Sequence, residues 1–271
     1  MTVADTEVEA EPKQRSLLSF MKRRSGPNDK PRLVVLGTGW AAARLSQDLD
    51  MSKYNLTVVS PRNHMVFTPL LASTTVGTLD FRSVTVSMRN IQPALAVGTN
   101  KYFNAKALDV NHEDQVVLCE ADGKEFEVQY DELAICTGAQ GSTFGIPGVI
   151  EHALPLRDVS DADAIRSTII KNLCESQIPG VTEKEKRRLL HFVIVGGGPT
   201  GVEFAGELSN LVKEDLRKLM PNVASSVRIT LVEARDILGS FNPDLRLYAE
   251  RILNQSGVEI VKAQVNAVNP Q

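Results

Sequence analysis

Apolar stretches and glycine turns follow one another twice along the chain. The first instance runs from an apolar stretch at 33–36 through Gly37-Thr-Gly39 and a helix-like segment to about Leu49, and ends in an apolar run at 55–60. Near-continuous Val, Ile and Leu are typical of parallel strands, because both faces of such strands are buried. The pattern predicts a strand, a helix and a second, parallel strand joined by a right-handed crossover.

The same arrangement returns in the second half of the chain. The elements predicted there are a strand at 189–195, a turn from Gly196 to Gly201, a helix ending before Pro221, a strand at 227–233, a helix at about 243–254 and a strand from Val258. The long helix is expected to bury one face, made up of Ala205, Leu208, Val212, Leu216 and Leu219. The predicted fold class is α/β with two Rossmann-like units.

A smaller set of elements is predicted between the two units. They are an antiparallel hairpin around Asp122-Gly123, a buried strand within 132–139 that ends in a Thr-Gly turn, a helix at 159–173 and a helix that opens at Thr182. The hairpin is expected because an Asp-Gly pair between β-type runs favours a type I′ turn. The last helix is expected to begin with a capping box, since Glu185 stands three positions after Thr182.

Glycine spacing gives both turns a chemical meaning. In a Gly-x-Gly-x-x-Gly turn the first glycine allows the tight bend, the second lets a pyrophosphate approach the backbone, and the third lets the helix pack closely. The second turn completes this pattern with Gly196, Gly198 and Gly201, whereas the first has Ala42 in the third place. A single copy also serves as an ordinary strand-to-helix corner, but two copies in the same setting predict two dinucleotide sites.

The residue that ends the second strand of each unit bears on the choice of nucleotide. A carboxylate there holds the ribose hydroxyls and repels a 2′-phosphate, so Glu233 favours NADH over NADPH, unless it is only a solvated strand-end acid. Ser60 takes this place in the first unit, with Arg62 two residues later. Spacing alone leaves the first nucleotide open.

Composition excludes several classes of protein. The formal charge of -3 gives no basic field for nucleic acid, which we do not expect as a partner. The 3 cysteines lie far apart, so neither a disulfide framework nor a CxxC metal or redox pair is expected, and we expect no metal site. The chain also has no apolar run of the roughly 20 residues that cross a bilayer.

Residues 1–30 lack a periodic apolar pattern. Acidic residues come first, and an acid-free basic stretch from Lys13 to Arg24 follows. One interpretation is a solvated, disordered arm. The other is an amphipathic targeting or membrane-surface helix, because apolar residues stand among the basic ones.

Two nucleotide sites without a cluster of acid-base or nucleophilic residues indicate electron transfer, in which cofactors supply the reactive chemistry. A flavin between a nicotinamide and an acceptor is the simplest arrangement. The disulfide-reductase version needs a close cysteine pair soon after the first turn, but residues 40–118 contain no cysteine.

Longer motifs resemble one family. SPRNHMVFTPLLASTTVGTLDFRSV at 60–84 and RRLLHFVIVGGGPTGVEFAGELS at 187–209 are similar to the type II, non-proton-pumping NADH dehydrogenases, particularly the alternative mitochondrial enzymes of plants and eukaryotic microbes. With GTGWAA and ICTGA, the resemblance runs from about residue 31 to the end. It implies a two-dinucleotide-binding flavoprotein, with the first part of an FAD-binding domain at 31–155 and an incomplete NADH-binding domain at 156–271. A C-terminally truncated chain is therefore expected.

The resemblance also implies roles for individual residues. FAD would contact Gly37, Gly39, Trp40, Ser60, Arg62, Thr68, Pro69, Leu70, Thr137 and Gly138. NADH would contact Gly196, Gly198, Pro199, Thr200, Gly201 and Glu233. Glu203 would lie near both nicotinamide and flavin and either position NADH or relay a proton. The alternative for Glu203 is a helix-start carboxylate stabilised only by the helix dipole.

The first functional hypothesis is an NADH:quinone oxidoreductase that passes hydride from NADH to FAD, and electrons on to a membrane quinone, without pumping protons. It implies a homodimer attached peripherally to the mitochondrial inner membrane. Two alternatives stay open: a soluble pyridine-nucleotide-dependent flavoprotein reductase with another acceptor, and a non-catalytic NAD(H)-binding remnant.

Overall fold

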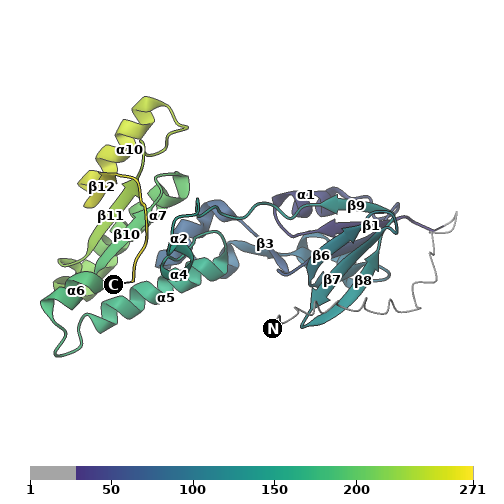
Figure 1. Ribbon diagram of the computed structural model, residues 1–271, viewed down its shortest axis with the longest axis horizontal. Helices are drawn as coiled ribbons and strands as arrows, with labels where there is room; N and C mark the ends of the chain where they lie inside the picture. Colours follow the sequence, from purple (N-terminus) through teal and green to yellow (C-terminus); the bar gives the residue numbers. More distant parts are fainter. Residues whose placement is uncertain (1–28, 271) are drawn as a thin grey trace, which may run out of the picture.

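A computed structural model describes residues 29–270 and arranges them in two lobes, each built on a parallel sheet (Figure 1). The two lobes correspond to the two predicted units, so the α/β fold class is confirmed. The arm predicted at 1–30 lies almost wholly outside the described residues.

The first lobe is built on a four-stranded parallel sheet in the order β5-β2-β1-β9. Its strands are β1 (Arg32–Leu36), β2 (Asn55–Ser60), β5 (Lys101–Asn104) and β9 (Glu132–Ile135). Helix α1 (Trp40–Asp48) connects β1 to β2 and buries Ala42 and Ala43 against one face. Val35 pairs with Val58 on one side and with Ala134 on the other, so β1 has neighbours at both edges.

An antiparallel sheet covers the other face of this parallel sheet. It consists of β6 (Lys106–Asn111), β7 (Val116–Ala121) and β8 (Lys124–Gln129). Asp122 and Gly123 join β7 to β8 with φ of 51° and 74°, and both positive values fit the predicted type I′ hairpin turn. Val117 of β7 packs in the same core as Val34 of β1.

The second lobe is built on a three-stranded parallel sheet in the order β10-β11-β12. Its strands are β10 (His191–Val195), β11 (Arg228–Glu233) and β12 (Val258–Lys262). Helices α5 (Val159–Glu175), α7 (Pro199–Asn210) and α10 (Pro243–Gln255) share one apolar core with the strands. Along β10, Ile194 points into this core, whereas Val193 and Val195 on the other face are 55% and 58% exposed.

Shorter elements complete the molecule. They are β3 (His64–Val66), β4 (Thr85–Ser87), α2 (Leu71–Val76), α3 (Met88–Ile91), α4 (Val149–His152), α6 (Glu183–Leu189), α8 (Arg217–Leu219), α9 (Pro221–Ala224), the 3₁₀ turns η1 (Thr68–Leu70), η2 (Phe81–Ser83) and η3 (Pro93–Ala96), and the π-helical turn η4 (Leu211–Leu216). Helix α2 comes from the first half of the sequence but packs against α5 and α7 of the second lobe (Figure 1).

Two predicted details around α6 differ from the structure. Strand β10 begins at His191 rather than Leu189, because Leu189 is still the last residue of α6. The capping box is only half formed. The hydroxyl of Thr182 accepts from the backbone N–H of Glu185 at 3.2 Å, but the Glu185 carboxylate pairs with Arg188.

The helix after the second glycine turn also departs from its predicted pattern. Ala205, Leu208 and Leu216 are buried as expected, but Leu219 is 77% exposed. The π-helical turn η4 lies between α7 and α8 and changes the angle between successive side chains. The 3.6-residue periodicity therefore does not extend to Leu219.

Candidate functional site

The first glycine loop leaves the carboxyl end of β1 and enters α1. Gly37 has a φ of 105°, and a Cβ atom there would lie 2.4 Å from the carbonyl oxygen of Cys136, just beyond β9. A Cβ atom on Gly39, the N-cap of α1, would meet no described atom within 4 Å. Open space therefore lies before the first N–H groups of α1, and this arrangement fits a pyrophosphate.

The second glycine loop repeats this geometry between β10 and α7. Gly196 has a φ of 108°, and a Cβ atom on Gly201 would lie 2.0 Å from the carbonyl oxygen of Gly196. Gly198 is the N-cap of α7 and faces open space, with Pro199 and Thr200 exposed in the first turn. The close contact of Gly201 with the loop and the open space at Gly198 together fit a second pyrophosphate before the first N–H groups of α7.

Glu233 ends β11 beside the second glycine loop. Its carboxylate accepts from the backbone N–H of Gly197 at 2.7 Å and of Arg235 at 3.0 Å. These backbone hydrogen bonds, that of Gly197 first, hold the pKa of Glu233 below its ordinary value. The group is therefore a charged carboxylate at the place where a dinucleotide has its adenosine ribose.

Ser60 takes the equivalent place in the first lobe and has different partners. It is buried, and its hydroxyl lies 3.3 Å from the hydroxyl of Thr38 in the first glycine loop. It also accepts from the backbone N–H of Arg62 at 3.2 Å. The Arg62 guanidinium pairs with Asp158, the N-cap of α5, at 2.6 Å, so this predicted FAD residue also ties the first lobe to α5.

The other residues predicted for FAD lie around the first loop. The ring of Trp40 lies 5.2 Å from that of Phe67, which directly precedes η1. The η1 residues Thr68, Pro69 and Leu70 are exposed, as are Thr137 and Gly138 after β9. Exposed apolar side chains beside a glycine loop fit a planar ring system. Gly37, Ser60 and Thr137 thus lie at the carboxyl ends of β1, β2 and β9, and the contact of Trp40 with Phe67 brings η1 next to the start of α1.

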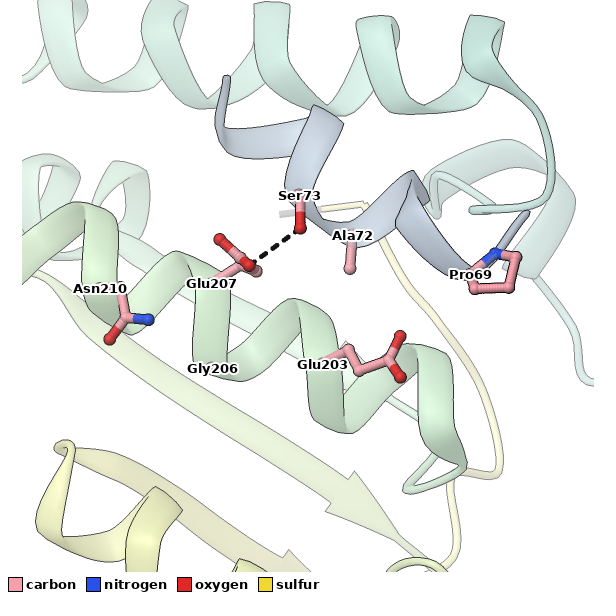
Figure 2. Close-up of a pocket in the computed structure, with 7 residues that line it drawn as sticks. All are labelled: Pro69, Ala72, Ser73, Glu203, Gly206, Glu207 and Asn210. Carbon is pink, nitrogen blue, oxygen red and sulfur yellow. Dashed lines mark hydrogen bonds between the residues drawn. The ribbon is translucent and has the colours of Figure 1, made fainter. Parts of the chain in front are cut away.

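A cavity of about 230 Å³ lies where the two lobes meet (Figure 2). One wall consists of Pro69, Ala72 and Ser73 from η1 and α2; the other consists of Glu203, Gly206, Glu207 and Asn210 from α7. Glu203, predicted from the sequence as the catalytic residue, thus faces the turn predicted to hold the flavin ring. Loss of hydration and, secondarily, the charge of Glu207 raise the pKa of Glu203.

Sequence reasoning missed three residues of this region: Gly197, Ser73 and Glu207. The sequence does hold a signal for Gly197, because it is the middle of an unbroken run of three glycines. The structure gives the reason: a Cβ atom on Gly197 would lie 2.9 Å from the Cβ atom of Glu233. Glu207 stands four positions after Glu203 and hence on the same helix face. Nothing local in the sequence indicates that Ser73 reaches it.

Residues 29–270, the part of the chain that the structure describes, carry neither a metal-binding cluster nor a membrane-spanning helix. In this range no three or more His, Cys, Asp and Glu side chains gather closely enough to bind a metal ion. None of the helices described here combines the length and the apolar character that a membrane crossing requires.

Comparison with known proteins finds a matching family and several relatives. A family model described as pyridine nucleotide-disulphide oxidoreductase matches residues 31–271. The internal alternative NAD(P)H-ubiquinone oxidoreductase A1 of Arabidopsis thaliana, a mitochondrial protein, is 50% identical over 255 residues, which are 90% of this chain and 49% of the relative. The mitochondrial external alternative NAD(P)H-ubiquinone oxidoreductase B1 of Solanum tuberosum is 42% identical over 261 residues, which are 93% and 45%. The chain thus spans about half the length of the curated relatives it matches.

Solved structures support the same fold. NDH2 from Plasmodium falciparum in complex with NADH matches with a TM-score of 0.85 and 29% identity, over 89% of this chain and 49% of that chain. The sulfide:quinone oxidoreductase of Aquifex aeolicus matches with a TM-score of 0.66 and 21% identity, over 89% and 53%, which bears on the fold alone. The resemblance stated from the sequence motifs is confirmed.

Proposed function

The chain belongs to the pyridine nucleotide-disulphide oxidoreductase family, and from that premise we propose that it carries the NADH and FAD sites of a non-proton-pumping NADH:quinone oxidoreductase. One observation carries the proposal: Pro69 and Glu203 line a single cavity. Pro69 closely follows Phe67, whose ring packs on Trp40 at the start of α1, and Glu203 lies near the start of α7. Two dinucleotides that extend from the two loops would bring their reactive ends together there.

Each lobe has the residues for one cofactor. We assign FAD to residues 31–155 and NADH to residues 156–271, with α2 as the segment that crosses between the lobes. Backbone N–H groups at the starts of α1 and α7 would hold the two pyrophosphates, since both loops leave open space there. Glu233 would accept from the ribose hydroxyls of NADH, and its negative charge disfavours the additional phosphate of NADPH.

The protein contributes binding and orientation. Bound FAD would accept the hydride of NADH and supply two electrons to a quinone. Thr68, Pro69 and Leu70 would support the flavin ring, and the packing of α2 on α7 would hold this turn beside Glu203. The Glu203 carboxylate would hold the nicotinamide end or carry a proton, and its raised pKa favours proton uptake.

The names of the relatives guide the proposed partners. Those at 42% to 50% identity are named as mitochondrial NAD(P)H-ubiquinone oxidoreductases. We therefore assign quinone as the electron acceptor. We also place the protein as a homodimer on the surface of the mitochondrial inner membrane.

Spectroscopy of the purified protein tests this function. FAD is supplied, excess is removed, and the oxygen-free protein is titrated with NADH and then with a short-chain quinone. We expect the flavin absorbance to bleach with NADH and to return with quinone. Bleaching without recovery would replace quinone by another acceptor. Failure of NADH to bleach bound flavin, or failure to retain FAD, would indicate an NAD(H)-binding protein without this activity.

A further inference from the structure

Helices α1 and α7 start at equivalent glycines but differ in charge along the next two turns. Arg44 of α1 stands at the position equivalent to Glu203 of α7, and Asp48 at that of Glu207. In α1 the two side chains form an exposed ion pair at 2.7 Å. In α7 the same spacing places two carboxylates on one face, where they repel each other. The acidic pair therefore requires compensation.

Glu207 receives that compensation from the first half of the chain. The Ser73 hydroxyl donates to Oε1 of Glu207 at 2.9 Å, and the Thr78 hydroxyl donates to Oε2 at 3.1 Å. Figure 2 shows the bond from Ser73 crossing between α2 and α7. Hydrogen bonds to a charged acceptor are stronger than those between neutral groups. Both oxygens of Glu207 are thus fastened to residues on the flavin side of the junction.

The segment that holds Glu207 is itself tightly placed. Gly77 ends α2 with a φ of 84°, and a Cβ atom there would lie 2.8 Å from the guanidinium carbon of Arg166 on α5. Helix α2 is therefore packed between α5 and α7. Because α2 directly follows η1, any movement of α7 along α2 also moves Glu203 relative to Pro69.

We propose that Glu207 is a positioning residue: its bonds to Ser73 and Thr78 set the separation between Glu203 and the turn Thr68–Leu70. The inference rests on the proposed function, because that separation is the one between NADH and the flavin ring. In this scheme Glu207 acts through α7, by fixing where Glu203 stands. Its charge has a second effect, since it adds to the raised pKa of Glu203.

The main test removes the hydroxyls and leaves the carboxylate. The double variant Ser73→Ala/Thr78→Val is compared with Ser209→Ala, because the Ser209 hydroxyl also fastens α7 to a neighbour, donating to the carbonyl oxygen of Ser256 at 2.7 Å. Amide hydrogen exchange is measured in FAD-free and FAD-loaded protein, and flavin bleaching is followed by stopped flow over a range of NADH concentrations.

In the double variant we expect faster exchange across residues 68–78 and about a tenfold lower bleaching rate at saturating NADH, because small misplacements of reacting groups are costly. The half-saturating NADH concentration should change less than about twofold, since the nucleotide loop is intact. Ser209→Ala should leave the exchange of 68–78 and the bleaching rate unchanged. Equal behaviour of the double variant and Ser209→Ala in both measurements would overturn the proposal.

A second variant, Glu207→Gln, preserves size and part of the hydrogen bonding but removes the charge. We expect an intermediate bleaching rate and an acid limb of its pH profile displaced to lower pH, because a neutral amide no longer raises the pKa of Glu203. A wild-type pH profile in this variant would contradict the effect of charge. If NADH fails to bleach wild-type flavin, the proposed function fails, whereas the exchange measurement still decides whether these bonds hold α7 on α2.

Discussion

The two glycine loops share one sequence design, but their surroundings make each glycine necessary for a different reason. Strand β1 pairs with β2 at one edge and with β9 at the other. The carbonyl oxygen of Cys136, which follows β9, blocks any Cβ atom on Gly37. Strand β10 pairs with β11, and among residues 29–270 no strand pairs with its other edge; a Cβ atom on Gly196 would meet nothing within 4 Å. In the second loop the tight contact moves to Gly201. The same motif therefore tolerates substitution at different positions.

The largest difference in stability loss between the two lobes is expected at the third position of the glycine motif, which is Gly201 in the second loop and Ala42 in the first. Gly201→Ala places a Cβ atom 2.0 Å from a backbone oxygen, so α7 must shift away from the loop. We expect the free energy of unfolding to fall by about 3 kcal/mol. We also expect NADH binding to become too weak to measure. Ala42→Gly in the first lobe removes only a methyl group from a helix and should cost about 1–2 kcal/mol. Denaturant unfolding and NADH titration test both, and tight NADH binding by Gly201→Ala would contradict the expected role of that contact.

The first glycine position should show the reverse order. Gly37→Ala and Gly196→Ala both force an L residue to a φ above 100°, and strain of this kind costs about 1–3 kcal/mol. Gly37→Ala additionally meets the carbonyl oxygen of Cys136. We expect it to lose at least about 1 kcal/mol more than Gly196→Ala and to retain less FAD. Equal losses of unfolding free energy would show that the neighbouring strand does not matter.

The strand-end residues should differ in nucleotide choice. Glu233→Gln weakens the bond from Gly197 and removes the negative charge, so we expect about tenfold weaker NADH binding and a smaller preference for NADH over NADPH. Ser60→Ala, at the equivalent place in the first lobe, is the matched control and should leave NADH affinity unchanged. Fluorescence titration with both nucleotides measures these affinities. If the ratio of the NADH and NADPH affinities is the same in Glu233→Gln as in the wild type, Glu233 is a solvated acid without a role in recognition.

Acid should affect Glu233 in a defined direction. Its pKa is lowered in the folded protein, so its contribution to stability is fully present above the ordinary glutamate value of about 4.3 and is lost as pH falls through the folded value. Wild-type protein should therefore lose unfolding free energy below that pH more steeply than Glu233→Gln. Parallel stability curves for the two proteins in acid would contradict the charged hydrogen bonds at this site.

The smallest changes in unfolding free energy are expected for the charged pairs near the starts of α1 and α7, and these changes have opposite signs. Arg44→Gln removes an exposed ion pair and should cost about 0.3–0.5 kcal/mol, whereas Glu203→Gln removes a repulsion and should gain a similar amount at pH 7. Since the pKa of Glu203 is raised on folding, this gain vanishes at pH values below its ordinary pKa, where both states are protonated. Unfolding at pH 7 and pH 4 measures it. Glu203→Gln should also slow flavin bleaching by NADH, and an unchanged rate would remove Glu203 from the reaction.

Local sequence patterns were sufficient to predict both strand-helix-strand units and the hairpin at Asp122-Gly123. Those elements depend on neighbours in sequence: continuous apolar runs, glycine spacing and turn residues. The exposure of Leu219 could not be predicted in this way, because a π-helical turn interrupts the periodicity. Nor could the contact of Ser73 with Glu207, which joins positions 134 apart. Such contacts depend on how the lobes pack, and no local pattern encodes that.

A structure of the protein with FAD and NADH bound tests the junction most directly. We expect the FAD pyrophosphate before the first N–H groups of α1 and the NADH pyrophosphate before those of α7. The flavin ring and nicotinamide should meet between Thr68–Leu70 and Glu203. A pyrophosphate bound away from either glycine loop, or reactive rings that lie outside this junction, would contradict the assignment of paired dinucleotide sites.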